Sequence, residues 1–313
     1  MRILFMGAGD IGLPVLRHLA GHPHHPLIAV LTQPDKPVGR KRVLTPPRIK
    51  CAAQDLGVPV FQPERIRHAV ETLRDLTADV FVVFAYGQIL PQAVLDLPRT
   101  ACLNLHASLL PKYRGASPIQ AAIAAGDRET AMTVMYMNAG LDTGDVLLED
   151  RIPIHSGETG ASLHDRLAAL APQTLDKALS ALESGDAPRH PQDHRLATHT
   201  KKLRREDGCI DWTQPAAVIE RLIRAYHPWP GTSTTLTTGA ETRLMKIFPP
   251  SEILSTSSAP GTLLECEGGG IVIACGTGAL RLSEIQPEGR RRMTTAEFLA
   301  GHPLPAGFQF GVE

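Results

Sequence analysis

The chain has 313 residues, of which 43% are hydrophobic, with 32 Lys and Arg against 32 Asp and Glu. This length predicts one large domain with a smaller one, and the composition is typical of a globular protein. The balanced charge excludes a protein that attracts nucleic acid through its net charge, so a polyanionic partner would have to bind local basic patches.

The first part of the chain alternates short apolar runs with helical patterns. Strands are predicted at 2–6, 27–32, 58–61, 80–84, 101–106 and 131–137, and helices between them at 11–20, 46–56 and 117–125. Such alternation predicts a Rossmann-like α/β fold, an open, mostly parallel sheet with helices on both faces. A long amphipathic helix follows at 159–182, and we expect a break near Pro172.

The first predicted strand runs into Gly7-Ala8-Gly9-Asp10-Ile11-Gly12, which matches the G-x-G-x-x-G pattern of dinucleotide-binding folds. Those folds also need a carboxylate at the end of the second strand to hold the ribose. Here that strand ends in Thr32-Gln33-Pro34. We therefore expect a tight strand-to-helix turn and no NAD, and a nicotinamide oxidoreductase stays an alternative that rests on the glycines alone.

The amino-acid composition changes after residues 184–188, where the chain becomes polar and basic. We predict a catalytic domain at 1–188, a basic linker at 189–207 and a C-terminal domain at 208–313. In the last, a helix at 214–225 precedes strands at 232–237, 242–248, 261–266, 270–275 and 279–285, with a loop at 249–260. Short runs separated by Gly, Pro and Thr predict a small antiparallel β-barrel of OB-like type.

Other sequence features argue against several classes of protein. Five scattered cysteines without a C-x-x-C pair indicate neither a disulfide framework nor a zinc site, and favour a reducing cytoplasm. The run at 22–26, His-Pro-His-His-Pro, lacks neighbouring ligands at ordered spacing, so we expect no metal. No stretch of 18 apolar residues and no signal-peptide pattern is present, so neither a membrane span nor export is expected.

The chemistry-bearing stretch begins at Asn104 and His106, two positions apart on a predicted strand and therefore on one face. Asp142 follows the strand at 131–137, so an amide, an imidazole and a carboxylate can meet at one sheet edge. A proton acceptor, an oxyanion donor and an orienting acid suit acyl transfer. Because no G-x-S-x-G elbow is present, we favour direct attack by a substrate amine. The alternative at this stage is a buried, hydrogen-bonded pair without a catalytic role.

Three segments, 104–111, Arg114-Gly115 and 140–145, resemble the signature of formyltransferases that use 10-formyltetrahydrofolate. The resemblance implies a folate co-substrate and a catalytic set of Asn104, His106 and Asp142. It places the folate against Ser108, Leu109, Leu110 and Pro111, and the pterin against backbone near Tyr86 and Gln88. One departure is Gly7-Ala8-Gly9, where the family usually has Gly-Thr-Pro.

Further stretches resemble the branch of that family that formylates initiator methionyl-tRNA. They lie at 32–42, at 207–212 with 224–231, and at 285–293 with 298–301. The resemblance implies transfer of the formyl group to the α-amino group of methionyl-initiator-tRNA for translation initiation, with 32–42 as the loop that enters the acceptor stem. Pro34 and Pro37 exclude a regular helix there.

Basic side chains are the candidates for tRNA contacts. They are Lys36, Arg40, Lys41, Arg42, Lys201, Lys202, Arg204 and Arg205. We expect no membrane and no obligate protein partner. A formyltransferase acting on a small amine such as a nucleotide sugar remains an alternative, although it would leave the basic loop without a use. An RNA-binding module confined to 209–313 is another alternative, although it would leave Asn104, His106 and Asp142 without a role.

Overall fold

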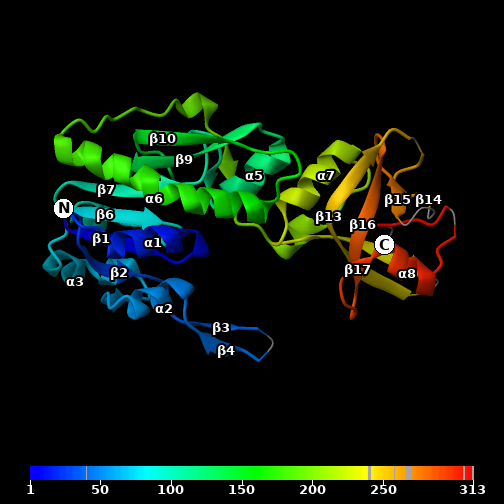
Figure 1. Cartoon of the computed structure of the whole chain (residues 1–313), viewed down its shortest axis with the longest axis horizontal. Coiled ribbons are helices and arrows are strands. Elements are labelled where there is room, and N and C mark those ends of the chain that lie inside the picture. Colours follow the sequence, from blue (N-terminus) through cyan, green and yellow to red (C-terminus); the bar gives the residue numbers. More distant parts are fainter. Residues whose placement is uncertain (40, 239–240, 257, 266–269, 306, 312–313) are drawn as a thin grey trace. The chain divides into compact units, whose positions relative to one another are not determined.

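The computed structural model describes residues 1–39, 41–238, 241–256, 258–265, 270–305 and 307–311 (Figure 1). The chain forms two compact units. The first comprises residues 1–118, 129–152 and 164–200, and the second comprises residues 119–128, 153–163 and 201–313. None of the helices in the described ranges is long and apolar enough to span a bilayer.

A seven-stranded sheet in the order β10-β9-β7-β6-β1-β2-β5 forms the centre of the first unit. The strands are β1 (Ile3–Gly7), β2 (Leu27–Leu31), β5 (Val60–Phe61), β6 (Val80–Phe84), β7 (Ala101–His106), β9 (Glu129–Tyr136) and β10 (Val146–Pro153). The five neighbouring strands β7, β6, β1, β2 and β5 are parallel to one another, whereas β9 is antiparallel to β7. The order reverses between β1 and β6, as in a Rossmann-like sheet, so the predicted fold class is confirmed.

Helices cover both faces of this sheet, which explains why its central strands are continuous apolar runs. On one face, Leu4 and Met6 pack in a buried cluster with Leu73 of α3 (Val70–Asp75) and Val94 of α4 (Gln92–Leu95). On the other, the ring of Phe5 lies under the turn that leads into α1 (Leu13–Ala20), close to α2 (Arg48–Asp55).

The glycine turn after β1 is explained by close packing. The N–H groups of Ala8 and Gly9 both donate to the carbonyl of Ala85, at 3.2 Å each. A Cβ added at Gly7 would lie 2.7 Å from the Phe5 ring, and one at Gly9 would lie 3.1 Å from Ala85. The glycines thus let the turn approach its neighbours, and two of its N–H groups are already engaged by protein rather than free for a pyrophosphate.

Helix α6 (Gly160–Ser184) continues through Pro172, so the predicted break was wrong. Leu167, Ala171 and Leu175 are completely buried on either side of the proline. An interior proline costs about 3 kcal/mol, but each buried leucine contributes about 1.5–3 kcal/mol. Packing of the apolar face therefore outweighs the missing hydrogen bond.

The basic segment after β2 forms a two-stranded hairpin, β3 (Lys36–Val38) and β4 (Val43–Thr45), which projects from the sheet in Figure 1. Asp35 anchors its base by accepting hydrogen bonds from Lys50 (2.8 and 2.9 Å) and Gln62 (2.7 Å). The Lys50 ammonium and the Gln62 amide lower the pKa of Asp35. Arg40 lies outside the described residues.

The second unit holds an antiparallel half-barrel sheet in the order β12-β13-β16-β15-β14, with β17 on β16. It contains most of α5 (Pro118–Ala125), and from residue 208 onward its helices and strands are α7 (Ala216–Ala225), β12 (Thr232–Thr238), β13 (Glu241–Leu254), β14 (Leu263–Glu265), β15 (Ile271–Ala274), β16 (Ala279–Pro287), β17 (Met293–Thr294) and α8 (Thr295–Gly301). The predicted loop at 249–260 was wrong over its first part, because β13 runs to Leu254. The register between β13 and β16 shifts between Phe248 and Ser251, because the two prolines there have no N–H to donate to the partner strand. Cys266, at the end of one predicted strand, lies outside the described residues.

Candidate functional site

The predicted catalytic residues Asn104 and His106 lie at the carboxyl end of β7, in the interior of the sheet, and both are buried. They alternate along the strand and therefore share a face. A buried amide and imidazole need polar partners. The loop between β9 and β10 supplies one of them.

Asp142 reaches this pair by a route that the sequence does not indicate. We expected the loop after the strand at 131–137 to leave the sheet at the edge where ligands bind. However, β9 is antiparallel to β7, and its Tyr136 lies opposite Leu103, which precedes Asn104 and His106 along β7. The loop therefore has to fold back along β7. Asp142 makes the turn with a positive φ of 51°, a conformation that Asp tolerates better than most residues.

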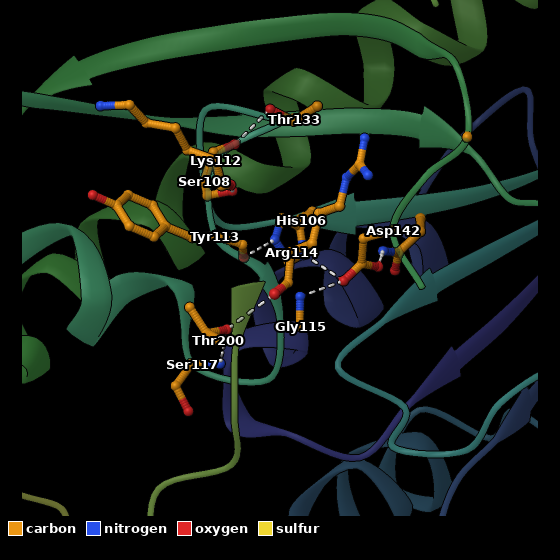
Figure 2. Close-up of polar contacts among 12 residues, drawn as sticks. His106, Ser108, Lys112, Tyr113, Arg114, Gly115, Ser117, Thr133, Asp142 and Thr200 are labelled. Carbon is orange, nitrogen blue, oxygen red and sulfur yellow. Dashed lines mark hydrogen bonds and ion pairs between the residues drawn. The ribbon is translucent and has the colours of Figure 1, made fainter. Parts of the chain in front are cut away.

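The three side chains converge as predicted, and Figure 2 shows His106 facing Asp142. The amide Nδ2 of Asn104 donates to Oδ1 of Asp142 at 3.4 Å, and Nδ1 of His106 lies 3.7 Å from Oδ2. The backbone N–H of Gly115 donates to the same Oδ2 at 2.8 Å. A mostly buried carboxylate is thus held by a backbone donor and faces both the amide and the imidazole.

The second ring nitrogen of His106 determines where a proton can go. Nε2 lies 3.0 Å from the carbonyl oxygen of Tyr113, which can only accept. We therefore assign the proton of the neutral ring to Nε2 and the lone pair to Nδ1. Nδ1 is then the nitrogen that can take a proton, next to the carboxylate of Asp142.

Gly115 is required where it stands. Its φ is 114°, and an added Cβ would lie 2.2 Å from the carbonyl oxygen of Thr200. The close approach arises because β8 (Arg114–Gly115) pairs with β11 (His199–Thr200). Glycine is the residue that allows this pairing while its N–H points at Asp142.

Gln192 supports the returning loop and was missed by sequence reasoning. Its amide donates to the carbonyls of Asp142 (3.0 Å) and Gly144 (2.7 Å). Its oxygen accepts from Nε (3.0 Å) and Nη2 (2.7 Å) of the buried Arg114, whose Nη1 lies 3.1 Å from Nδ1 of His194. Gln192 and His194 belong to a polar stretch without periodicity, so no sequence signal separates them from a solvated linker.

The start of the predicted linker is therefore hydrogen-bonded within the first unit. Besides Gln192, Thr198 accepts from the N–H of Tyr113 at 2.8 Å, and Thr200 accepts from the N–H of Ser117 at 3.1 Å. These contacts hold the chain on both sides of Arg114 and Gly115.

The predicted folate residues Ser108 to Pro111 lie directly beyond β7. The hydroxyl of Ser108 donates to the carbonyl of Lys112 at 2.7 Å, so this side chain stabilises the turn itself. Leu110 and Pro111 border a cavity of about 450 Å³, whose other walls are Val146–Glu149 and 190–193. The stretch thus offers mainly backbone and apolar surface to a ligand.

Tyr86 and Gln88 are engaged by the protein. The Tyr86 ring is buried, its hydroxyl has no hydrogen-bond partner among the described residues, and burial raises its pKa to about 12. Gln88 accepts from the N–H of Ile66 at 2.8 Å and donates to the carbonyl of Pro63. A ligand at this loop would meet backbone and Ile89, which is 83% exposed.

The described basic candidates lie in two places, all of them exposed. Lys36, Lys41 and Arg42 are on the hairpin of the first unit. Lys201, Lys202, Arg204 and Arg205 are in the second unit, where Lys201 pairs with Asp207 at 2.7 Å. Exposed pairs of this kind are weak, so the lysine can exchange its partner for a phosphate.

The His-rich turn meets an acidic side chain, which the sequence did not indicate. Nε2 of His18 and of His22 lie 2.7 and 3.6 Å from Oδ1 of Asp176. However, Nδ1 of His22 accepts from the N–H groups of His24 and His25. The proton of the neutral ring is then on Nε2, which suits a hydrogen bond to the carboxylate better than a metal.

Comparison with known proteins agrees with this geometry. A family model described as formyl transferase matches residues 1–179, and another described as formyl transferase, C-terminal domain, matches residues 202–303. The methionyl-tRNA formyltransferase of Akkermansia muciniphila is 46% identical over 316 residues and covers 100% of both chains. That of Xanthomonas euvesicatoria is 48% identical, over 98% of this chain and 99% of the relative.

A solved structure of HypX from Aquifex aeolicus in complex with tetrahydrofolic acid superposes with a TM-score of 0.61. It is 18% identical and the match covers 96% of this chain and 47% of HypX, so the chain spans about half the length of that protein and the likeness concerns the fold alone. The family models and the near full-length relatives decide the matter: the chain belongs to the formyl transferase family, in its methionyl-tRNA formyltransferase branch.

Proposed function

We propose that this protein transfers the formyl group of 10-formyltetrahydrofolate to the α-amino group of initiator methionyl-tRNA. The observation that carries the proposal is the convergence of Asn104, His106 and Asp142 in a chain of this family. The names of the full-length relatives support the acceptor, and the tetrahydrofolic acid in the HypX structure supports the donor. Such an enzyme would act in the cytoplasm, where translation takes place.

The reaction joins the amine nitrogen to the formyl carbon and breaks the bond from that carbon to N10 of the folate. The carbonyl oxygen becomes negative in the tetrahedral intermediate, and the amide of Asn104 together with protonated His106 would stabilise it. In comparable sites one such donor contributes about 3–4 kcal/mol. The oxyanion then collapses and expels the tetrahydrofolate.

The amine must lose a proton and N10 must gain one. Nδ1 of His106 is the nitrogen free to take a proton, and Asp142 lies beside it to hold the ring and order a bridging water. A positioned acid–base group of this kind contributes about 10²–10⁴ in rate. No residue of the chain needs to form a covalent intermediate.

The basic residues would hold the tRNA. Lys36, Lys41 and Arg42 on the hairpin, with Arg40, are proposed to reach the acceptor stem, and the cations at 201–205 to bind phosphates elsewhere. The proposed division is a catalytic domain at 1–188, a linker at 189–207 and a tRNA-binding domain at 208–313. The hydrogen bonds of Gln192 and Thr198 tie the beginning of that linker to the catalytic unit.

The test is formyl transfer from 10-formyltetrahydrofolate to charged initiator tRNA, compared with elongator methionyl-tRNA and with a His106→Ala variant. We expect initiator-selective transfer that the substitution abolishes. Transfer to neither tRNA by a protein that still binds folate would refute the proposed acceptor. It would favour a small amine instead.

A further inference from the structure

The second unit displays an exposed tryptophan on a well-held turn. The chain has two tryptophans. Trp212 is 4% exposed and its Nε1–H donates to Thr234 at 2.9 Å, whereas Trp229 is 52% exposed. A single exposed apolar side chain needs no ligand to explain it. The turn and the charges around Trp229 are what distinguish it.

The turn at 226–231 is held from several sides within the second unit. Gly231 donates to the carbonyl of Tyr226 at 2.8 Å, and Ala161 donates to that of His227 at 3.0 Å. Gly208 packs so closely that an added Cβ would lie 2.0 Å from the carbonyl oxygen of Gly231. The indole is therefore presented by fixed backbone, which lowers the entropy that a ligand must remove on binding.

Cations flank this turn on both sides. On one side, burial and the nearby Asp207 raise the pKa of Tyr226 and the nearby Lys201 lowers it, so this ion pair borders the turn. On the other side, the His227 ring lies 6.3 Å from that of Phe248, on whose face the Arg292 guanidinium lies at 4.3 Å. Burial and the neighbouring Arg292 lower the pKa of His227, so its ring adds aromatic surface rather than charge.

We propose that Trp229 is a stacking platform for an unpaired base of RNA, and that its occupant is the single-stranded 3′ end of the tRNA substrate. The inference rests on the proposed function and goes beyond it by naming the residue that reads this end. An indole face accepts any base, whereas bases in a duplex are already stacked. Lys201 and Arg292, the cations next to this turn, can exchange their acidic partners Asp207 and Glu284 for phosphates of the same strand.

Tryptophan fluorescence tests the contact directly, because Trp212 is buried and Trp229 supplies the exposed signal. The full-length protein is titrated with uncharged initiator tRNA, with the same tRNA lacking its unpaired 3′ nucleotides, and with a blunt RNA duplex. We expect quenching by the intact tRNA alone, and its loss in Trp229→Phe. Equal quenching by the trimmed tRNA or the duplex would overturn the proposal.

Kinetics supply the second test. Stacking on one base is worth about 1–3 kcal/mol, so Trp229→Ala should raise the KM for charged initiator tRNA about 5- to 150-fold. Trp229→Phe keeps a ring and should lose less, while the affinity for folate stays constant in both. Ile253→Ala removes another half-exposed apolar side chain from the same unit and should leave KM unchanged.

The outcomes separate the inference from the function on which it rests. An unchanged KM in Trp229→Ala, with normal formyl transfer, would refute the platform and leave the proposed function intact. Absence of transfer by the unmodified protein would refute the proposed function instead.

Discussion

Gln192 provides the sharpest test of how the site is built. Its side chain joins the buried guanidinium of Arg114 to the carbonyls of Asp142 and Gly144 through four hydrogen bonds. Gln192→Ala leaves two charged donors and two carbonyls without a partner in a buried region. Hydrogen bonds to charged groups contribute about 1.5–3 kcal/mol each and neutral ones about 1 kcal/mol, so losing two of each should lower the free energy of unfolding by up to about 5–8 kcal/mol.

Gln192→Glu separates the two halves of this network. A carboxylate keeps an acceptor for Arg114 but cannot donate to the carbonyls of Asp142 and Gly144, which it would repel. Stability should be partly restored, while the loop that carries Asp142 loses its support. A displacement of about 1 Å in such a site costs about 10²-fold in rate, so kcat should stay low in both variants.

The assay pairs thermal unfolding with kcat for formyl transfer, and Gln173→Ala on the exposed side of α6 is the matched control. We expect the control to behave as the unmodified protein does. A Gln192→Ala protein with normal stability and normal kcat would refute the reasoning. So would a Gln192→Glu protein with full kcat.

Asp142→Asn should fold normally and lose about 10²–10⁴ in kcat; full turnover by a folded variant would contradict its assigned role. Gly115→Ala forces a side chain into a positive-φ position against a backbone carbonyl, and should lower the melting temperature by an amount equivalent to about 1–3 kcal/mol or more. In the double variant Lys41→Ala with Arg42→Ala, the slope of log affinity for tRNA against log salt should fall by about 2; an unchanged slope would exclude phosphate contacts there. Asp35 has a lowered pKa in the folded state, chiefly through its hydrogen bond from the lysine on α2, so its contribution to stability is present above the usual carboxyl pKa of about 4 and is lost as the pH falls below it. The protection of the hairpin amides against hydrogen exchange, relative to their intrinsic rates at each pH, should therefore fall in acid, and Asp35→Asn should remove that pH dependence.

Much of the first unit was predictable because its strands are buried on both faces. β1 and β6 are uninterrupted apolar runs bounded by turn residues, which is the pattern of a covered parallel sheet, and β7 is buried at every position although it carries Asn104 and His106. The hairpin of β3 and β4 was not predicted as strands. Val38, Val43 and Leu44 are exposed on it, so it lacks the one-sided burial that makes a strand visible in a sequence.

In two proline-containing segments, the sequence predicted irregular structure where the chain forms a regular helix or strand. Local chemistry predicted a break at Pro172 and a loop from 249 onward, yet the helix and the strand both continue. The buried apolar face of the helix outweighs the local cost of Pro172, and the strand continues because residues 251–254 pair with residues 279–282 of β16. That comparison cannot be made from the residues next to the proline alone.

By itself the sequence determined what depends on near neighbours along the chain: which runs form strands, and that Asn104 and His106 share a face, because side-chain direction in a strand repeats every two residues. Only the tertiary structure decided the direction of β9, the return of Asp142 to that face, and its support by Gln192, 50 residues further on. Strand direction and loop closure are chosen by differences in long-range packing and hydrogen-bond free energy, and these leave no periodic mark on the sequence.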